Sequence, residues 1–173
     1  MIEAFVGLGS NIENPGKQLQ TACQKLAALP KTQLVALSAV YESPPMGPPD
    51  QPWYLNACAR LQTSREPEDL LDALLAIEAH MGRVRHRRWG ERCIDLDLLL
   101  FGNRRIQSDR LTVPHPGLYT RDFVLRPLSD LVGSEYVMPN GVDIGTLLAG
   151  CTTGSLMKRD IQLPTGESLG ISP

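Results

Sequence analysis

The stretch Ile94-Asp95-Leu96-Asp97-Leu98-Leu99-Leu100-Phe101 decides the fold, because it is the most apolar strand-like segment of the chain. It ends at the turn-forming pair Gly102-Asn103. Its leucines predict a central, buried strand of a sheet. Two carboxylates inside such a strand need a compensating cation or strong hydrogen-bond donors, because an isolated buried charge is costly. The segment is therefore expected to carry part of the core and part of a functional site.

The segments before this strand predict alternating strands and helices. Apolar residues at intervals of three and four predict one helix over residues 17–29 and a second over residues 67–81, which begins at Pro67. Strands are predicted over residues 2–8, 33–41 and 54–63. The resulting order, β-α-β-β-α-β, predicts an α+β, ferredoxin-like fold with one antiparallel sheet and two helices on a single face.

The patterns weaken beyond Arg104. Short strand or helix pieces around residues 111–116, 123–131 and 144–148 are interpreted as additions to the core. We expect a single domain over residues 1–150, since 173 residues suit one hydrophobic core. Residues 151–173 are expected to form a C-terminal extension, with residues 165–173 mobile.

The composition excludes several classes of protein. Apolar residues make up 42% and charged residues 21% of the chain, as in ordinary globular proteins. A net charge of −2 argues against a protein built to bind nucleic acid or anionic membranes, and no apolar run is long enough to span a bilayer.

The N-terminus does not resemble a signal peptide. The four cysteines lack metal-site spacing; they are Cys23, Cys58, Cys93 and Cys151. A cytoplasmic protein with buried, reduced thiols is expected.

Asp95 and Asp97 form the first candidate site. Alternate residues of a strand share a face, so both carboxylates project together while Leu96 and Leu98 point the other way. Carboxylates on a rigid strand suit Mg²⁺, which takes few protein ligands and completes its shell with water and phosphates. The alternative, a solvent-facing pair without a ligand, is disfavoured by the apolar neighbours.

The segment before the strand is strongly basic. Residues 82–92 hold five arginines and one histidine between glycines. Such a run alone is usually a solvated face or a weak nucleic-acid patch, but guanidinium groups also bind phosphate in bidentate fashion. Beside an acid pair it indicates a site for metal-bound polyphosphate. We expect this segment to close over the site when the metal-bound polyphosphate binds.

Two further groups of residues are less specific. Five prolines within residues 43–52 predict a stiff, shaped loop. His115, between two prolines, would alone be interpreted as a structural hydrogen-bonding residue, and Trp89 and Phe123 as core residues.

Seven motifs, in this order, match one family. They are Gly9-Ser10-Asn11, Ser43-Pro44-Pro45-Met46-Gly47, Tyr54-Leu55-Asn56, Gly82-Arg83-x-Arg85, Arg88-Trp89-Gly90-x-Arg92, Asp95-Leu96-Asp97 and Leu111-x-x-Pro114-His115. Over about residues 2–130 the chain resembles the 6-hydroxymethyl-7,8-dihydropterin pyrophosphokinases of folate biosynthesis. The resemblance implies a ferredoxin-like fold and ATP-dependent transfer of pyrophosphate to the hydroxymethyl group of the pterin, releasing AMP. It also implies two Mg²⁺ ions, ATP as co-substrate, no nucleic-acid or membrane partner, and a monomer.

The resemblance also implies a role for individual residues. The implied catalytic residues are Arg83, Arg92, Asp95 and Asp97, the last two binding the metal. The implied pterin-binding residues are Ser43, Pro44, Met46, Tyr54, Asn56, Trp89, Asp95 and Phe123, with the pterin stacked between Trp89 and Phe123. The implied ATP-binding residues are Glu78, Arg85, Arg88, Arg92, Leu98, Arg110, Thr112, His115 and Arg121. The chain departs from the family pattern at Ser43, Trp53 and Glu91, where threonine, a small polar residue and proline are usual.

The rival interpretation is a ferredoxin-like RNA-binding module that uses the basic segment. Such a module needs exposed aromatic residues on its central strands. The strand offers Asp95 and Asp97 instead, which repel phosphate unless a metal is present. The sequence therefore favours the enzyme.

Overall fold

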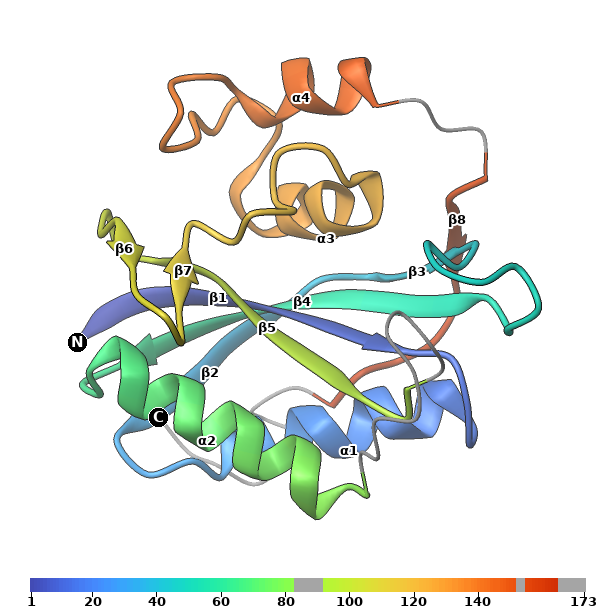
Figure 1. The fold of residues 1–173 in the computed structure, drawn as a ribbon, viewed down its shortest axis with the longest axis horizontal. Helices are drawn as coiled ribbons and strands as arrows, with labels where there is room; N and C mark the ends of the chain where they lie inside the picture. Colours follow the sequence, from blue (N-terminus) through green and yellow to red (C-terminus); the bar gives the residue numbers. More distant parts are fainter. Residues whose placement is uncertain (83–91, 152–154, 165–173) are drawn as a thin grey trace.

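The computed structural model describes residues 1–82, 92–151 and 155–164 (Figure 1). Its elements follow the predicted β-α-β-β-α-β order, with the second predicted strand divided in two. They are β1 (Ile2–Ser10), α1 (Pro15–Ala27), β2 (Thr32–Leu37), β3 (Val40–Ser43), β4 (Tyr54–Thr63), α2 (Pro67–His80), β5 (Asp95–Phe101), β6 (Ile106–Gln107), β7 (Thr112–Val113), α3 (Asp122–Val132), α4 (Ile144–Gly150) and β8 (Met157–Arg159). The predicted α+β, ferredoxin-like class is confirmed.

The main sheet is antiparallel and runs in the order β5-β1-β4-β3-β8, with β2 also pairing with β4. The strand predicted over residues 33–41 is interrupted at Ser38, whose Oγ accepts a hydrogen bond from the Cys58 N–H at 2.8 Å. The expectation that residues 94–101 form a central strand is wrong, because β5 lies at the end of this order. It is buried by helices on its two faces and not by strands on its two edges.

Helices cover both faces of the sheet: the two predicted helices, α1 and α2, share one face as expected, and α3 and α4 cover the other, which the sequence did not predict. In Figure 1, α1 and α2 lie below the sheet and α3 and α4 lie above it. One core fills the α1–α2 side and includes Leu96 and Leu98; a second, with Phe5, Leu99 and Leu100, fills the α3–α4 side. Strand alternation sends successive residues to opposite faces, but a bulge in β5 opposite Phe5 and Val6 places both Leu99 and Leu100 in the second core. Residues 123–131 and 144–148 are therefore a second layer of the core and not mere additions.

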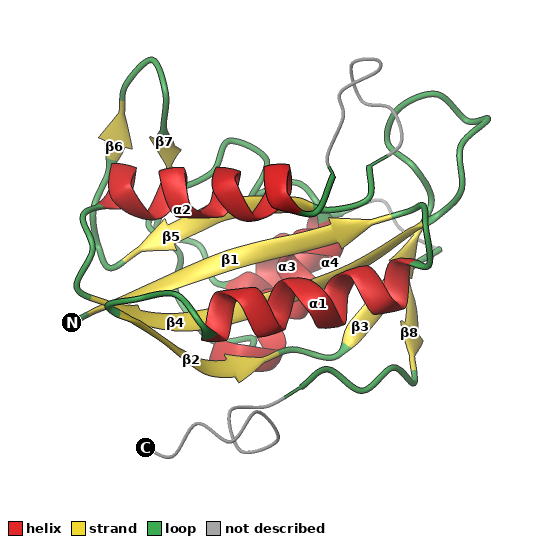
Figure 2. Ribbon diagram, turned by 90° about the horizontal axis from the view of Figure 1, so that it is seen from below, coloured by secondary structure: helices red, strands yellow, loops and turns green. Residues whose placement is uncertain are grey.

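The helices begin where the sequence provides starting signals. Asn14 caps α1 by accepting the Lys17 N–H at its side-chain oxygen, and Pro15 occupies the first turn. Helix α2 begins at Pro67 with Glu68 and Asp69 in its first turn, where the helix dipole favours acids. These local signals explain why both helices were predictable (Figure 2).

The C-terminal extension contributes a strand that the sequence did not predict. Strand β8 pairs with β3, and beyond it the Gln20 side chain donates a hydrogen bond to the Gln162 carbonyl at 2.9 Å. Residues 165–173 lie outside the described residues, so their expected mobility stays a prediction, as does the domain boundary at residue 150. None of the helices within the described ranges is long and apolar enough to cross a membrane.

Candidate active site

The floor of the site is a patch of sheet without side chains. Gly9 pairs with Asp95 on one neighbouring strand and with Asn56 on the other, and Gly7 pairs with Asp97 on β5. A methyl group on Gly9 would lie 3.7 Å from Tyr54 Cδ1 and 3.8 Å from Asn56 Oδ1. Between Asp95 and Asn56 the sheet therefore offers a flat surface on which a planar ligand can rest.

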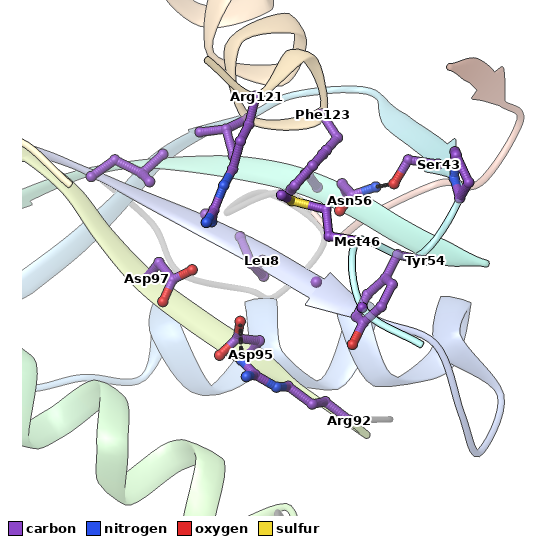
Figure 3. Close-up of a pocket in the computed structure, with 17 residues that line it drawn as sticks. Leu8, Ser43, Met46, Tyr54, Asn56, Arg92, Asp95, Asp97, Arg121 and Phe123 are labelled. Atoms are coloured by element: carbon purple, nitrogen blue, oxygen red, sulfur yellow. Dashed lines mark hydrogen bonds and ion pairs between the residues drawn. The ribbon is translucent and has the colours of Figure 1, made fainter. Parts of the chain in front are cut away.

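A pocket lies between this floor and helix α3, and we call it the α3 pocket (Figure 3). The described members of the implied pterin set all line it, namely Ser43, Pro44, Met46, Tyr54, Asn56, Asp95 and Phe123. Phe123 extends from α3 and Tyr54 comes from the start of β4, so aromatic side chains from two elements line the cavity. Arg92, Asp97 and Arg121 also line it, together with residues to which the sequence gave no role, namely Gly7, Leu8, Gly9, Gly47, Ala57, Leu99 and Val124.

Asn56 has a fixed orientation in the α3 pocket. Its Nδ2 donates to the Tyr41 carbonyl at 3.1 Å and to Ser43 Oγ at 2.8 Å. A carbonyl only accepts, so the contact with Tyr41 identifies the nitrogen of the amide. Both amide hydrogens are used in these bonds, and Oδ1 remains on the side of Gly9 as an acceptor for a ligand N–H.

A second pocket, the α2 pocket, lies at the outer edge of β5. Helix α2 forms one wall, and the segment from Arg110 to Pro116 forms another. It contains the described members of the implied ATP set apart from Arg121, namely Glu78, Arg92, Leu98, Arg110, Thr112 and His115. Its other lining residues include Leu71, Leu75, Leu111 and Pro116, which the sequence did not identify. Arg121 lines the α3 pocket instead.

Glu78 is a buried carboxylate at this edge, with 3% of its surface exposed. It accepts the Leu96 N–H at 3.1 Å, which shows that the backbone of Leu96 points outward from the sheet. The alternation along a strand directs the backbone of Leu98 to the same outer edge. A ligand in the α2 pocket can therefore meet main-chain groups of β5.

The two pockets meet at Arg92, Asp95 and Asp97, which line both. Arg92 Nη1 donates to Asp95 Oδ2 at 2.8 Å, and both side chains are partly buried. His115 Nε2 lies 3.9 Å from Asp97 Oδ2. Ligands in the two pockets would thus approach each other over the acid pair.

His115 is held as a neutral imidazole. The Gly117 N–H donates to His115 Nδ1 at 3.1 Å, which places the ring proton on Nε2, the nitrogen that faces Asp97. Burial, and then the charge of Arg121, lower the pKa of His115 from its ordinary value, against an opposing effect of Asp95. The side chain therefore presents an N–H donor to the α2 pocket at neutral pH.

Asn11 joins three parts of the site, although the sequence gave it no role. Its Oδ1 accepts the Arg92 N–H at 2.9 Å, and its own N–H donates to the Arg92 carbonyl at 3.1 Å. Its Nδ2 donates to Gln51 Oε1 at 3.1 Å and to the Pro52 carbonyl at 3.0 Å. The end of β1, the proline-rich loop and Arg92 are thereby fixed relative to one another.

Asp95 and Asp97 are the residues of the site that could hold a magnesium ion. Among the described residues, no group of three or more His, Cys, Asp or Glu side chains gathers to hold a metal. Two carboxylates on one strand face suit an ion that takes the rest of its ligands from water and phosphate oxygens. The donor set fits Mg²⁺ bound together with a polyphosphate.

Four predicted site residues, Arg83, Arg85, Arg88 and Trp89, lie outside the described residues. The same holds for Glu91 and for the expected closure of the basic segment. Their roles stay predictions.

Residues 5–133 match the family described as 7,8-dihydro-6-hydroxymethylpterin-pyrophosphokinase (HPPK). The chain belongs to the HPPK family. It is 48% identical over 148 residues to a Haemophilus influenzae protein named 2-amino-4-hydroxy-6-hydroxymethyldihydropteridine pyrophosphokinase, covering 86% of this chain and 92% of that protein. A Pseudomonas aeruginosa protein of the same name is 49% identical over 147 residues, covering 85% of this chain and 90% of the relative.

The fold is also found in solved structures. A crystal structure of Plasmodium falciparum HPPK-DHPS aligns with a TM-score of 0.63 and 14% identity. The alignment covers 86% of this chain and 43% of that chain. At this identity the likeness concerns the fold alone.

Proposed function

We propose that this chain is an ATP-dependent pyrophosphokinase that acts on 6-hydroxymethyl-7,8-dihydropterin in folate biosynthesis. The hydroxymethyl oxygen of the pterin attacks the β-phosphorus of ATP. The bond between that phosphorus and the oxygen bridging to the α-phosphate breaks, AMP leaves, and the hydroxyl proton is released. The family and its named relatives support this reaction.

The observation that carries the proposal is the meeting of two pockets at one acid pair. A transfer reaction needs a donor site and an acceptor site whose reactive ends face each other. The α3 and α2 pockets share Arg92, Asp95 and Asp97 and otherwise have different linings. The shared residues mark the place where the phosphoryl group would pass between substrates.

The α3 pocket suits the pterin. Its glycine floor can accept the planar, bicyclic ring system of the pterin, and Phe123 faces that floor from α3. Asn56 Oδ1 offers an acceptor to the amino-pyrimidine edge, because both amide hydrogens of Asn56 are already used. A ring without an N–H donor at this position would leave Asn56 Oδ1 without a partner on binding.

The α2 pocket suits the nucleotide. Apolar side chains from α2 and from the outer strand edge can enclose a base, while Glu78 lies where a ribose hydroxyl could donate to it. Arg110 and the neutral His115 supply donors for phosphate oxygens. Arg110 also pairs with Asp72 and Glu68 of α2.

Asp95 and Asp97 would hold magnesium, and we propose two ions as in the family resemblance. Bound magnesium neutralises phosphate charge and orients the reacting oxygens. Arg92 lies against Asp95, where its guanidinium can stabilise the negative charge that develops on the transferred phosphoryl group. Arg83, Arg85, Arg88 and Trp89 are proposed to complete the site from the basic segment. A cytoplasmic, monomeric enzyme without nucleic-acid or membrane partners remains part of the proposal.

The direct test is to incubate the purified chain with ATP, Mg²⁺ and the pterin alcohol and to identify the nucleotide product by chromatography. We expect AMP in equal amount to the pterin diphosphate, and none when the pterin is omitted. ADP as the product would overturn the proposal, and so would the absence of turnover in a folded protein.

A further inference from the structure

Gly117 lies directly under the guanidinium group of Arg121. A methyl group on the Cα of Gly117 would be 2.5 Å from Arg121 Cζ, 2.6 Å from Nε and 2.7 Å from Nη1. Carbon atoms in packed proteins approach to about 3.5 Å, so the two groups could not keep these positions. Only a residue without a side chain leaves this space for the guanidinium.

The backbone of Gly117 does not itself require glycine. Its φ angle is outside the left-handed range, which in the described part of the chain is adopted by Gly82, Gly102, Gly133 and Gly141 among the glycines. Its N–H donates to His115 Nδ1, a bond that any residue except proline could make. The close approach of Arg121 is therefore the physical reason for glycine here.

The main chain of Arg121 is fixed, and the space beside Gly117 allows its head group to lie where it does. Arg121 caps α3, and its carbonyl accepts the N–H groups of Val124 at 3.1 Å and Leu125 at 3.0 Å. From this position the side chain extends into the α3 pocket, toward the side on which Asp97 lies (Figure 3). Its charge also acts on His115, across the junction of the two pockets.

We propose that Gly117 is a positioning residue for the reaction, because its missing side chain leaves the space that the Arg121 guanidinium occupies in the α3 pocket, on the side of the acid pair. This inference rests on the proposed function. Gly117 touches neither pocket itself and acts through Arg121. A methyl group at Gly117 forces the head of Arg121 away from this position, which removes a cationic group from the place where phosphate would lie.

The test is a double-mutant cycle with Gly117→Ala, Arg121→Ala and the double variant, assayed for AMP formation with both substrates varied. We expect Gly117→Ala to lower kcat/KM about tenfold or more, since displacements of an ångström at a site have effects of up to about a hundredfold. In the Arg121→Ala background the same change is expected to alter kcat/KM less than twofold, because the group it displaces is gone. Equal losses in both backgrounds, or full activity of Gly117→Ala, would overturn the inference.

Gly150→Ala is the matched control. Gly150 ends α4, and among the described residues no atom lies within 4 Å of a methyl group placed on it. This variant is expected to keep wild-type kinetics. If wild type and Gly150→Ala both fail to form AMP, the proposed function fails; if both are active and Gly117→Ala is too, only this inference fails.

Thermal unfolding decides the case even if Gly117→Ala does not fold. The space vacated in Arg121→Ala accepts a methyl group, so the double variant is expected to melt within a few degrees of Arg121→Ala. A double variant that unfolds as readily as Gly117→Ala would show that the methyl group clashes with something other than Arg121.

Discussion

The chemistry of the site depends on a few side chains whose positions the strand register fixes. Gly9 between Asp95 and Asn56 leaves room for a flat ligand, and Asn11 ties Arg92 to the proline-rich loop. The sequence predicted the acid pair because the period of two along a strand is a local property. It did not predict Asn11, because that role depends on contacts with residues 40 and 81 positions away.

Removing either carboxylate should abolish turnover without unfolding the chain. We expect Asp95→Asn and Asp97→Asn to lower kcat by about a hundredfold or more, since each variant loses charge that supports phosphate transfer. The melting temperature should fall little, because both side chains are partly exposed. Near-wild-type kcat at ordinary Mg²⁺ concentration in either variant would contradict the assignment of these residues.

His115 should make stability depend on pH. Its folded pKa is lowered by burial, so the unfolded chain binds this proton more readily as pH falls through about 6.5. Stability is therefore expected to decrease from pH 7 to pH 5, and less steeply in His115→Gln. Urea unfolding at several pH values measures this, and parallel curves for the two proteins would contradict it.

The cysteines should behave as structural thiols. Cys23 and Cys58 are buried, and burial raises the pKa of Cys23 to about 12 and that of Cys58 further. We expect iodoacetamide at pH 8 to modify Cys151 first in the native protein, and all four cysteines after unfolding. Mass spectrometry of the labelled peptides measures the order, and rapid native labelling of Cys23 would contradict it.

At the scale of elements, helix α3 forms one wall of the α3 pocket, and Asp130 connects this helix to β3 and to the residue before it. The Tyr41 hydroxyl donates to Asp130 at 3.0 and 2.9 Å, and the Ala39 N–H donates to the same carboxylate at 3.2 Å. Tyr41 also provides the carbonyl that holds Asn56. The sequence predicted a short strand or helix piece around residues 123–131 but neither its helical form nor its place, because its partner strand lies about ninety positions away.

Loss of the hydrogen bonds between Tyr41 and Asp130 should weaken binding of the pterin more than binding of the nucleotide. Tyr41→Phe and Asp130→Ala are expected to raise the KM for the pterin several-fold and to destabilise the fold by about 1 kcal/mol. The KM for ATP should stay unchanged, because no α3 residue lines the α2 pocket within the described chain. Steady-state kinetics with each substrate varied measures the split, and equal changes in both KM values would contradict a specific role for the contact.

At the scale of the whole molecule, the sheet separates two cores and brings the two pockets together at one edge strand. The sequence predicted the ferredoxin-like order correctly, because helix caps, prolines and periodicities are local. It placed β5 centrally, because a strand buried by helices on both faces has the same apolar composition as one flanked by strands. Among the described residues, the predicted pterin set lines the α3 pocket and the predicted ATP set lines the α2 pocket, except that Arg92 and Asp95 line both and Arg121 lines the α3 pocket.

The central claim is that an intact pyrophosphoryl group passes from ATP to the pterin at the junction of the two pockets. The most direct measurement follows ATP labelled with ³²P at the β position, with Mg²⁺ and the pterin alcohol. We expect the label in the pterin product, in equal amount to the unlabelled AMP formed. Label in ADP would contradict the claim because only the γ-phosphate would have moved, and label in free pyrophosphate would show hydrolysis without transfer.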